Sequence, residues 1–323
     1  MKIGVLELIN FRSYQKRSFE FENLTIIEGN NGIGKSNLLE AIYLLATGKS
    51  FRADRDDEMI RYGQIMATVK SMGIEVFVAD RKRFEVNGVP RRMMDAVGKV
   101  KAVLFGPADM EIVTGSPGVR RRYLDFILIQ KDREYRRCLV SYEKGVRQRN
   151  KILGNIREGI ANKSQLFFWD KLLIKDGGYI TDKREEYIEF LGERIVYDKS
   201  VISEMRLKQY EVEEVAAATT LVGPHRDDFT ILFDDKDVSK YGSRGEQRMA
   251  VWWMKMKELE ILSEDGDMPI LLLDDVFSEL DHYHRDEIIS VTRKLITDGG
   301  QVIMTTADKH LIPQIEGSKL IEL

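Results

Sequence analysis

The sequence predicts an α/β fold that is interrupted by a helical lobe. Two short apolar runs, residues 24–27 and 270–273, have the length and character of buried strands, and polar residues follow each of them closely. Between these runs lies a long stretch without proline, in which apolar residues recur at helical spacing. We therefore expect two parts: an α/β lobe of residues 1–115 plus 215–323, and a helical lobe of residues 116–214.

Turn-forming residues refine this division. The α/β lobe is expected to hold mixed sheets with flanking helices, and Asn87-Gly88 is a strong indication of a hairpin turn. In the helical lobe, Gly177-Gly178 predicts a break in a long helix. A β-meander is predicted from the strands 66–70, 74–80, 84–86 and 103–105.

The composition is that of a globular protein with an ample core. The chain has 323 residues, of which 43% are hydrophobic and 32% charged. Its net charge of −3 gives no global indication of a nucleic-acid partner, so any such surface must come from local clustering. The single cysteine, Cys138, excludes an internal disulfide. No apolar run approaches the ~20 residues of a membrane span, and a signal-peptide core is missing, so we expect a cytoplasmic protein.

Residues 29–36 contain the pattern G-x-x-x-x-G-K-S, placed between the first apolar run and a helical stretch. The glycines let the backbone bend so that successive N–H groups face inward, and these groups bind phosphate oxygens together with a helix N-terminus. Lys35 is expected to reach the β- and γ-phosphates of a nucleotide, and the Ser36 hydroxyl to hold Mg²⁺. The predicted nucleotide-binding residues are Gly29, Asn30, Asn31, Gly32, Gly34, Lys35, Ser36 and Asn37.

The second apolar run ends in two carboxylates, Asp274 and Asp275. The carboxyl end of a buried parallel strand is where an α/β fold places a metal site. Asp274 is therefore the expected Mg²⁺ partner beside Ser36, and Asp275 is the expected base that positions an attacking water. Lys35, Asp274 and Asp275 are the predicted catalytic residues.

Two further segments resemble motifs of ABC-type ATPases. Ser243-Arg244-Gly245-Glu246-Gln247 precedes an apolar helical stretch and resembles the ABC signature, which faces a γ-phosphate from a helix N-terminus. After the acidic strand, Ser278 and Asp281 lie in a segment that resembles the D-loop. A single S-x-G-x-Q match is weak evidence, but the order and spacing of the whole set are specific.

In their order along the chain, these motifs and four others resemble the RecF family of DNA replication and repair proteins. The resemblance extends from residue 2 to about residue 306. Its segments are N-F-R-S-Y from Asn10, G-N-N-G-x-G-K-S, K-S-F-R from Lys49, G-S-P-x-x-R-R-x-Y-L-D from Gly115, G-P-H-R-D-D from Gly223, S-R-G-E-Q-R and L-L-D-D-V-F-S-E-L-D.

The resemblance implies an ABC-type P-loop ATPase head that uses ATP and Mg²⁺ and forms a homodimer around ATP. Each nucleotide would lie between the P-loop of one subunit and the signature of the other, and Arg12 would contact it. The resemblance also implies ATP-dependent binding to DNA at junctions of double and single strand, and cooperation with RecO and RecR to load RecA. Because Asp275 is one methylene shorter than the glutamate usual in transporters, we expect slow hydrolysis that DNA stimulates.

Basic residues near these motifs are the candidates for DNA contact. No aromatic stacking platform is evident in the sequence, so we expect phosphate contacts to dominate and binding to be sensitive to salt and independent of sequence. The segment His225-Arg226-Asp227-Asp228 either forms a structural hydrogen-bond network or contacts the edge of the nucleotide site, and we favour structure. The candidate DNA-binding residues are Lys49, Arg52, Arg55, Arg120, Arg121 and Arg122.

Three alternative functions share part of this pattern. An SMC-like or defence-associated ATPase would share every motif from Gly29 to Asp281 and differ in its partner, although the sequence lacks a long coiled coil. A transporter ATPase subunit predicts a switch histidine, where this chain has Thr305-Thr306. A small-molecule kinase or GTPase predicts a base-reading N-K-x-D segment, and the signature and D-loop patterns argue against that class.

Overall fold

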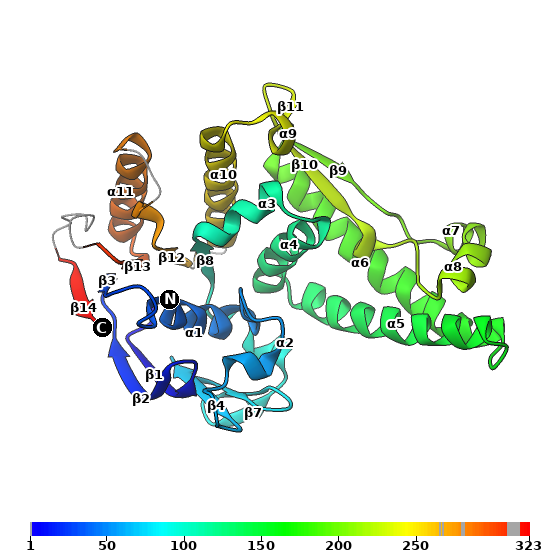
Figure 1. Cartoon of the computed structure of the whole chain (residues 1–323), viewed down its shortest axis with the longest axis horizontal. Coiled ribbons are helices and arrows are strands. Elements are labelled where there is room, and N and C mark those ends of the chain that lie inside the picture. The colour runs from blue at the N-terminus through cyan, green and yellow to red at the C-terminus, as the bar shows by residue number, and fades with distance from the viewer. Residues whose placement is uncertain (1, 265, 267, 279–281, 309–316) are drawn as a thin grey trace. The chain divides into compact units, whose positions relative to one another are not determined.

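The computed structural model describes residues 2–264, 266, 268–278, 282–308 and 317–323 (Figure 1). The chain divides into two compact units, which we describe separately. The first unit comprises Met1–Asp109 and Lys255–Leu323, and the second comprises Met110–Met254. No helix among the described residues is long and apolar enough to cross a membrane.

The nucleotide motifs of the first unit lie on a parallel sheet. Among the described residues its strands follow the order β14-β3-β13-β12-β8, and every neighbouring pair is parallel. The central strands are almost completely buried, as is usual for strands of a parallel sheet. The strands are β3 (Leu24–Glu28), β8 (Ala102–Phe105), β12 (Ile270–Asp274), β13 (Gln301–Thr306) and β14 (Lys319–Glu322).

An antiparallel sheet forms the other layer of the first unit, in the order β2-β1-β4-β5-β6-β7. Its strands are β1 (Val5–Phe11), β2 (Tyr14–Glu20), β4 (Ala67–Ser71), β5 (Ile74–Val78), β6 (Arg83–Val86) and β7 (Val89–Arg91). The predicted hairpin at Asn87-Gly88 joins β6 to β7. The predicted fourth meander strand was wrong, because residues 102–105 are β8 and pair in parallel with β12. All four of these side chains are buried, which suits a parallel core strand better than a meander edge.

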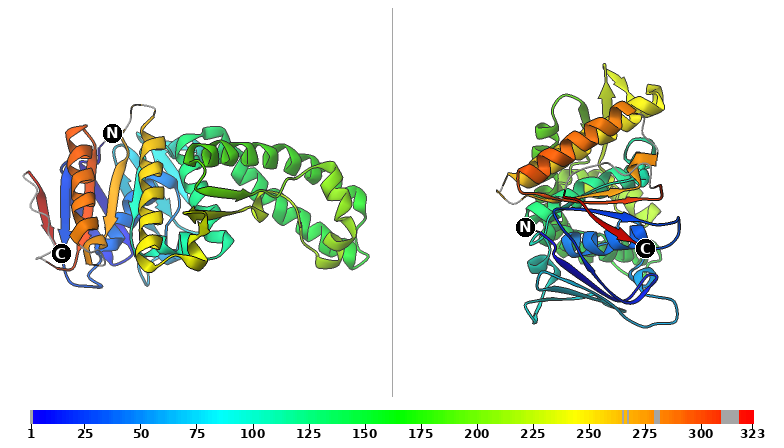
Figure 2. Two further views of the ribbon diagram at one scale, coloured as in Figure 1. Left: turned by 90° about the horizontal axis from the view of Figure 1, so that it is seen from above. Right: turned by 90° about the vertical axis from the view of Figure 1, so that its left-hand side faces the viewer.

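Helix α1 (Lys35–Thr47) lies between the two sheets of the first unit (Figure 2). It contacts β1, β4 and β5 of the antiparallel sheet and β8, β12 and β13 of the parallel sheet. Because it is covered from two sides, its buried surface includes polar residues as well as the leucines of its apolar face. Other short or peripheral helices of this unit are η1 (Asp56–Met59), α2 (Met93–Ala96), η2 (Pro107–Met110), η5 (Val276–Ser278) and α11 (His282–Thr297).

The second unit is built around two long helices, α5 (Arg133–Arg157) and α6 (Phe167–Leu191), which run antiparallel side by side (Figure 1). The predicted break at Gly177-Gly178 was wrong, because α6 continues through it. A Cβ on Gly177 would lie 2.8 Å from a ring carbon of Tyr142 on α5, so this glycine serves close helix packing. The remaining helices are α3 (Glu111–Thr114), α4 (Pro117–Lys131), η3 (Lys163–Leu166), α7 (Glu204–Gln209), α8 (Glu211–Ala217), η4 (Pro224–Arg226) and α9 (Val238–Tyr241).

The second unit extends further along the chain than the helical lobe predicted at residues 116–214. Strand β9 (Ile195–Asp198) pairs with β10 (Asp228–Phe233), which in turn pairs with β11 (Lys236–Asp237). The pairing of β10 with β9 ties the segment after residue 214 to residues 195–198, which lie inside the predicted lobe. Helix α10 (Arg244–Ser263) begins in the second unit and ends in the first.

Candidate nucleotide-binding site

The loop between β3 and α1 has the backbone geometry that the glycine pattern predicts. Gly32 and Gly34 adopt positive φ angles of 82° and 118°. A Cβ on Gly34 would lie 2.8 Å from Ser13 Oγ and 3.0 Å from the Tyr14 hydroxyl oxygen, so only glycine fits there without a shift. The Tyr14 hydroxyl donates to the Gly34 carbonyl oxygen at 3.1 Å. The corner after β1, which contains Ser13 and Tyr14, therefore packs against this loop.

Lys35 curls back over this loop. The residue is 6% exposed, and its Nζ donates to the carbonyl oxygens of Gly29 at 2.6 Å and Asn30 at 3.1 Å. Asn30, Asn31 and Gly32 are exposed around it. A buried ammonium group at the N-terminus of α1, ringed by exposed backbone, has the charge and position to attract phosphate oxygens.

Ser36 and Asp274 meet although 238 positions separate them. The Ser36 hydroxyl donates to Asp274 Oδ1 at 2.8 Å, which joins the P-loop helix to the carboxyl end of β12. Hydroxyl and carboxylate oxygens are ligands that Mg²⁺ prefers, and Mg²⁺ commonly completes its shell with substrate phosphates and water. No group of three or more His, Cys, Asp or Glu side chains that could hold a metal was found among the described residues. The pair therefore fits a metal that a nucleotide brings, rather than an all-protein cage.

Thr305, at the end of β13, completes this edge and received no role from the sequence. Its hydroxyl donates to Asp274 Oδ1 at 2.8 Å and accepts the Asp275 N–H at 3.0 Å. Asp275 has a φ of 50°, in the left-handed region that few residues adopt. The threonine thus holds the carboxylate of Asp274 and the backbone of Asp275. Only the pairing of Thr305 with Asp274 across parallel strands could have identified it.

The turn after β8 lies directly against Asp274. A Cβ on Gly106 would lie 3.0 Å from the Asp274 Cβ, and the Gly106 N–H donates to Asp109 Oδ2 at 2.8 Å. Asp109 also pairs with the buried Lys255 at 3.0 Å, and Lys255 pairs with Glu258 at 3.1 Å. Burial raises the pKa of Glu258 to about 7. These ion pairs hold the C-terminal part of α10 against the turn after β8, next to the end of β12.

Arg12 is held by protein acceptors. Its guanidinium donates to both carboxylate oxygens of Glu40, at 2.8 and 2.6 Å, and to the Glu58 carbonyl oxygen at 2.5 Å. The side chain of Asn37, another predicted nucleotide contact, donates to Ser13 Oγ at 2.8 Å. Sequence reasoning missed Glu40, which is fully buried in α1. Its charge amid an apolar helix was the feature that could have indicated a buried ion pair.

The signature-like segment forms a capping box at the start of α10. The Ser243 N–H donates to Glu246 Oε2 at 2.7 Å, and the Glu246 N–H donates to Ser243 Oγ at 3.3 Å. These hydrogen bonds lower the pKa of Glu246. Ser243, Arg244, Gly245 and Glu246 are all exposed, whereas Gln247 is half-buried. The segment therefore offers an exposed N-terminus of a long helix, where anions are favoured.

The predicted D-loop begins in η5 (Val276–Ser278). Asp281 and the side chain of Ser278 lie outside the described residues.

Several candidate DNA-binding residues pair with acidic groups of the chain. Arg52 pairs with Glu40 at 2.9 Å and Arg55 with Asp57 at 2.6 Å. Lys49 is half-buried and Arg122 is exposed. Of this set, Lys49, Arg52 and Arg55 belong to the first unit, and Arg120, Arg121 and Arg122 belong to the second.

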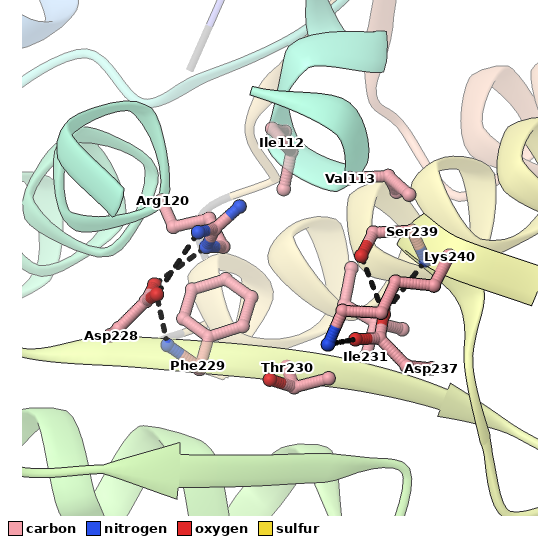
Figure 3. Close-up of a pocket in the computed structure, with 10 residues that line it drawn as sticks. All are labelled: Ile112, Val113, Arg120, Asp228, Phe229, Thr230, Ile231, Asp237, Ser239 and Lys240. Atoms are coloured by element: carbon pink, nitrogen blue, oxygen red, sulfur yellow. Dashed lines mark hydrogen bonds and ion pairs between the residues drawn. The ribbon is translucent and has the colours of Figure 1, made fainter. Parts of the chain in front are cut away.

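Arg120 lies at one end of a cavity of about 180 Å³ within the second unit (Figure 3). Its guanidinium group forms a bidentate ion pair with Asp228, in which Nε and Nη2 donate to the two carboxylate oxygens at 2.6 and 3.0 Å. Arg121 Nη1 donates to the Asp227 carbonyl oxygen at 2.8 Å. Asp237 and Lys240, which form an ion pair at 3.0 Å, line the other end of the cavity. Arg120 therefore contributes to the packing of α4 on β10.

The segment 225–228 forms a structural hydrogen-bond network around the buried Asp227, as the favoured interpretation expected. Asp227 is fully buried and accepts hydrogen bonds from Arg184 at 2.8 Å and from the Tyr197 hydroxyl at 2.5 Å. His225 lies between the Tyr142 hydroxyl and the Thr220 carbonyl oxygen, at 2.8 and 3.0 Å. Burial lowers the pKa of His225 to about 4, so its ring is neutral at pH 7.

The fold and this edge of the parallel sheet define a P-loop ATPase head of the ABC type. Residues 2–101 match the family model of the RecF/RecN/SMC N terminal domain. The chain is 34% identical to the DNA replication and repair protein RecF of Desulfitobacterium hafniense over 97% of its length and 95% of the relative. It is 35% identical to RecF of Moorella thermoacetica over 100% and 95% of the two chains. The chain belongs to the RecF family of DNA replication and repair proteins.

Solved structures of this family have the same fold. The recombination mediator protein RecF-ATP in the RecFOR pathway matches with a TM-score of 0.87 and 32% identity, over 96% of this chain and 93% of that one. The corresponding RecF-ATPrS structure matches with a TM-score of 0.85 and 30% identity, over 97% and 94%. The similarity therefore covers both units and not the P-loop region alone.

Proposed function

We propose that this protein binds ATP with Mg²⁺ at the P-loop and dimerises around the nucleotide to hold DNA. The observation that supports this most directly is the convergence of Ser36, Asp274 and Thr305 beside the buried Lys35 ammonium group. In this proposal Lys35 contacts the β- and γ-phosphates, and Ser36 and Asp274 hold the metal. The metal supplies charge neutralisation of the phosphates when bound.

The signature of a second copy closes the site in this proposal. Ser243 and the exposed start of α10 present partial positive charge, which suits a γ-phosphate held by another subunit. Because ATP then forms part of the dimer interface, dimer affinity is linked to ATP occupancy. Hydrolysis removes the γ-phosphate and loosens the dimer. Asp275, held by Thr305, positions the attacking water.

Hydrolysis is proposed to be slow and stimulated by DNA, so that the protein acts as a timed clamp. DNA contact falls to exposed basic residues that the ion pairs leave accessible, and Arg122 is one of them. Binding through phosphates is independent of sequence and weakens with salt. By analogy with relatives of the RecFOR pathway, the clamp is proposed to act at junctions of double and single strand with RecO and RecR, and to promote RecA loading.

The test is ATP-dependent assembly and DNA binding on the same samples. Wild type and Lys35→Ala are sedimented with and without ATP and Mg²⁺, and a fluorescent duplex with a single-stranded extension is then titrated at low and moderate salt. We expect dimers and salt-sensitive DNA binding in the wild type with ATP, and neither in Lys35→Ala. Dimers that form equally without ATP, or DNA affinity that does not change with salt, would contradict the proposal.

A further inference from the structure

One buried carboxylate on the P-loop helix holds two arginines from separate segments of the first unit. Glu40 is fully buried in α1. It accepts hydrogen bonds from Arg12 Nε and Nη2 at 2.8 and 2.6 Å, and from Arg52 Nε at 3.0 Å. The Ser50 hydroxyl adds a further bond at 2.5 Å. A single negative charge therefore faces two positive ones.

The two arginines are held differently. Arg12 also donates to the Glu58 carbonyl oxygen, and its side chain is 19% exposed. Arg52 instead donates to the Asn37 amide oxygen, and its side chain is 37% exposed. Asn37 lies in the first turn of α1, directly after Ser36. Arg52 is thus the outer guanidinium, on the side of the P-loop.

The lower exposure of Arg12 and its two bonds to Glu40 indicate that Arg52, rather than Arg12, can leave. A buried carboxylate without a cation is strongly destabilising, whereas one that keeps a hydrogen-bonded guanidinium is not. If Arg52 leaves, Glu40 retains both bonds from Arg12 and the bond from Ser50. Arginine is well suited to move from a carboxylate to a phosphate, because the two groups present similar forks of oxygens.

We propose that Glu40 is the shared counter-ion of a phosphate-responsive arginine switch. Arg52 leaves Glu40 for a phosphate of the bound ligand, and Arg12 stays and keeps the buried carboxylate neutralised. Glu40 is then a positioning residue that sets how readily Arg52 is released. The inference rests on the proposed function only for the source of the phosphate, which is DNA or ATP.

Ligand affinity gives the first test. Glu40→Gln keeps the shape of the side chain and removes the charge that competes for Arg52. We expect the affinity for a fluorescent duplex, or for ATP alone, to rise roughly three- to tenfold, which corresponds to the loss of one typical, partly exposed hydrogen bond between Arg52 and Glu40. The ligand whose affinity rises identifies the source of the phosphate. The gain should vanish in Glu40→Gln combined with Arg52→Met. If DNA is the source, Arg52→Met alone should also reduce the salt slope for DNA by about one.

The matched control is Glu20→Gln, which releases Lys319 from an ion pair at 3.3 Å elsewhere in the first unit. The Glu20 side chain is 76% exposed, so the loss of this pair should leave both affinities unchanged. A Glu40→Gln variant in which neither affinity rises would overturn the switch. A merely structural Glu40 predicts equal or weaker binding after the substitution.

Thermal stability gives a second test that needs no ligand. Arg12→Ala and Arg52→Ala each leave Glu40 with one guanidinium, whereas the double variant leaves it with none. We expect the double variant to lose more melting temperature than the sum of the two single losses. Additive losses would refute the shared counter-ion even if Glu40→Gln fails to fold. If the wild type binds neither ATP nor DNA, the proposed function fails. The comparison of the single and double arginine variants still tests whether Glu40 is a shared counter-ion.

Discussion

Replacing Thr305 with valine tests whether the end of β13 sets the geometry of the acidic pair. The substitution keeps the shape and removes two hydrogen bonds, one to Asp274 and one from the Asp275 N–H. Each is worth about 1 kcal/mol, so we expect the free energy of unfolding to fall by about 2 kcal/mol. Asp275 would lose the hydrogen bond to its backbone N–H, which holds its positive φ angle. Displacement of a catalytic carboxylate by about 1 Å can lower the rate of hydrolysis roughly a hundredfold.

The assay separates this effect from general destabilisation. ATP hydrolysis with DNA is expected to fall roughly ten- to a hundredfold, while ATP affinity changes little because Lys35 is untouched. Thr25→Val is the control, because Thr25 is buried and bonds to the Glu22 backbone at the opposite end of β3. It should lose comparable stability and keep its hydrolysis rate. Equal loss of hydrolysis in both variants, or none in Thr305→Val, would refute the reasoning.

Three further predictions concern the loop and the buried network. Lys35→Ala should abolish measurable ATP binding in calorimetry and change the urea midpoint little, because its partners are loop carbonyls. Gly34→Ala should cost about 1 to 3 kcal/mol of unfolding free energy, since its φ of 118° and the contact with Ser13 both oppose a side chain; an unchanged urea midpoint would contradict this. The depressed pKa of His225, about 4, makes its stability contribution complete above about pH 6.5 and lost as the pH falls, by about 2 kcal/mol between about pH 7 and pH 5. Urea unfolding of His225→Gln should show a correspondingly flatter pH dependence, and an equally steep one would contradict the assignment.

The sequence was sufficient to predict what depends on local pattern. The glycine spacing predicted the loop around Lys35, and the apolar run before Asp274 predicted a buried parallel strand. Carboxyl ends of parallel strands meet at one edge, so the approach of Ser36 to Asp274 also followed from the pattern.

What the sequence did not predict depends on pairings between distant segments. Thr305 contacts Asp274 and Asp275 because β13 lies beside β12 in the sheet, and this strand order cannot be predicted from the sequence pattern. The run at 103–105 was predicted as a meander strand because it follows one, yet it belongs to β8 of the parallel sheet. Gly177-Gly178 predicts a helix break because glycine has low helix propensity, whereas in the structure Gly177 leaves room for the Tyr142 ring of the facing helix.

Mixing two variants tests the shared site most directly. Lys35→Ala removes the P-loop lysine, Ser243→Arg obstructs the signature, and neither variant alone should dimerise with ATP. A mixed pair combines the intact P-loop of one subunit with the intact signature of the other, so the mixture should sediment partly as dimer when ATP and Mg²⁺ are present. If the wild type dimerises but the mixture stays monomeric, or if Ser243→Arg dimerises as the wild type does, the two half-sites do not close over one nucleotide.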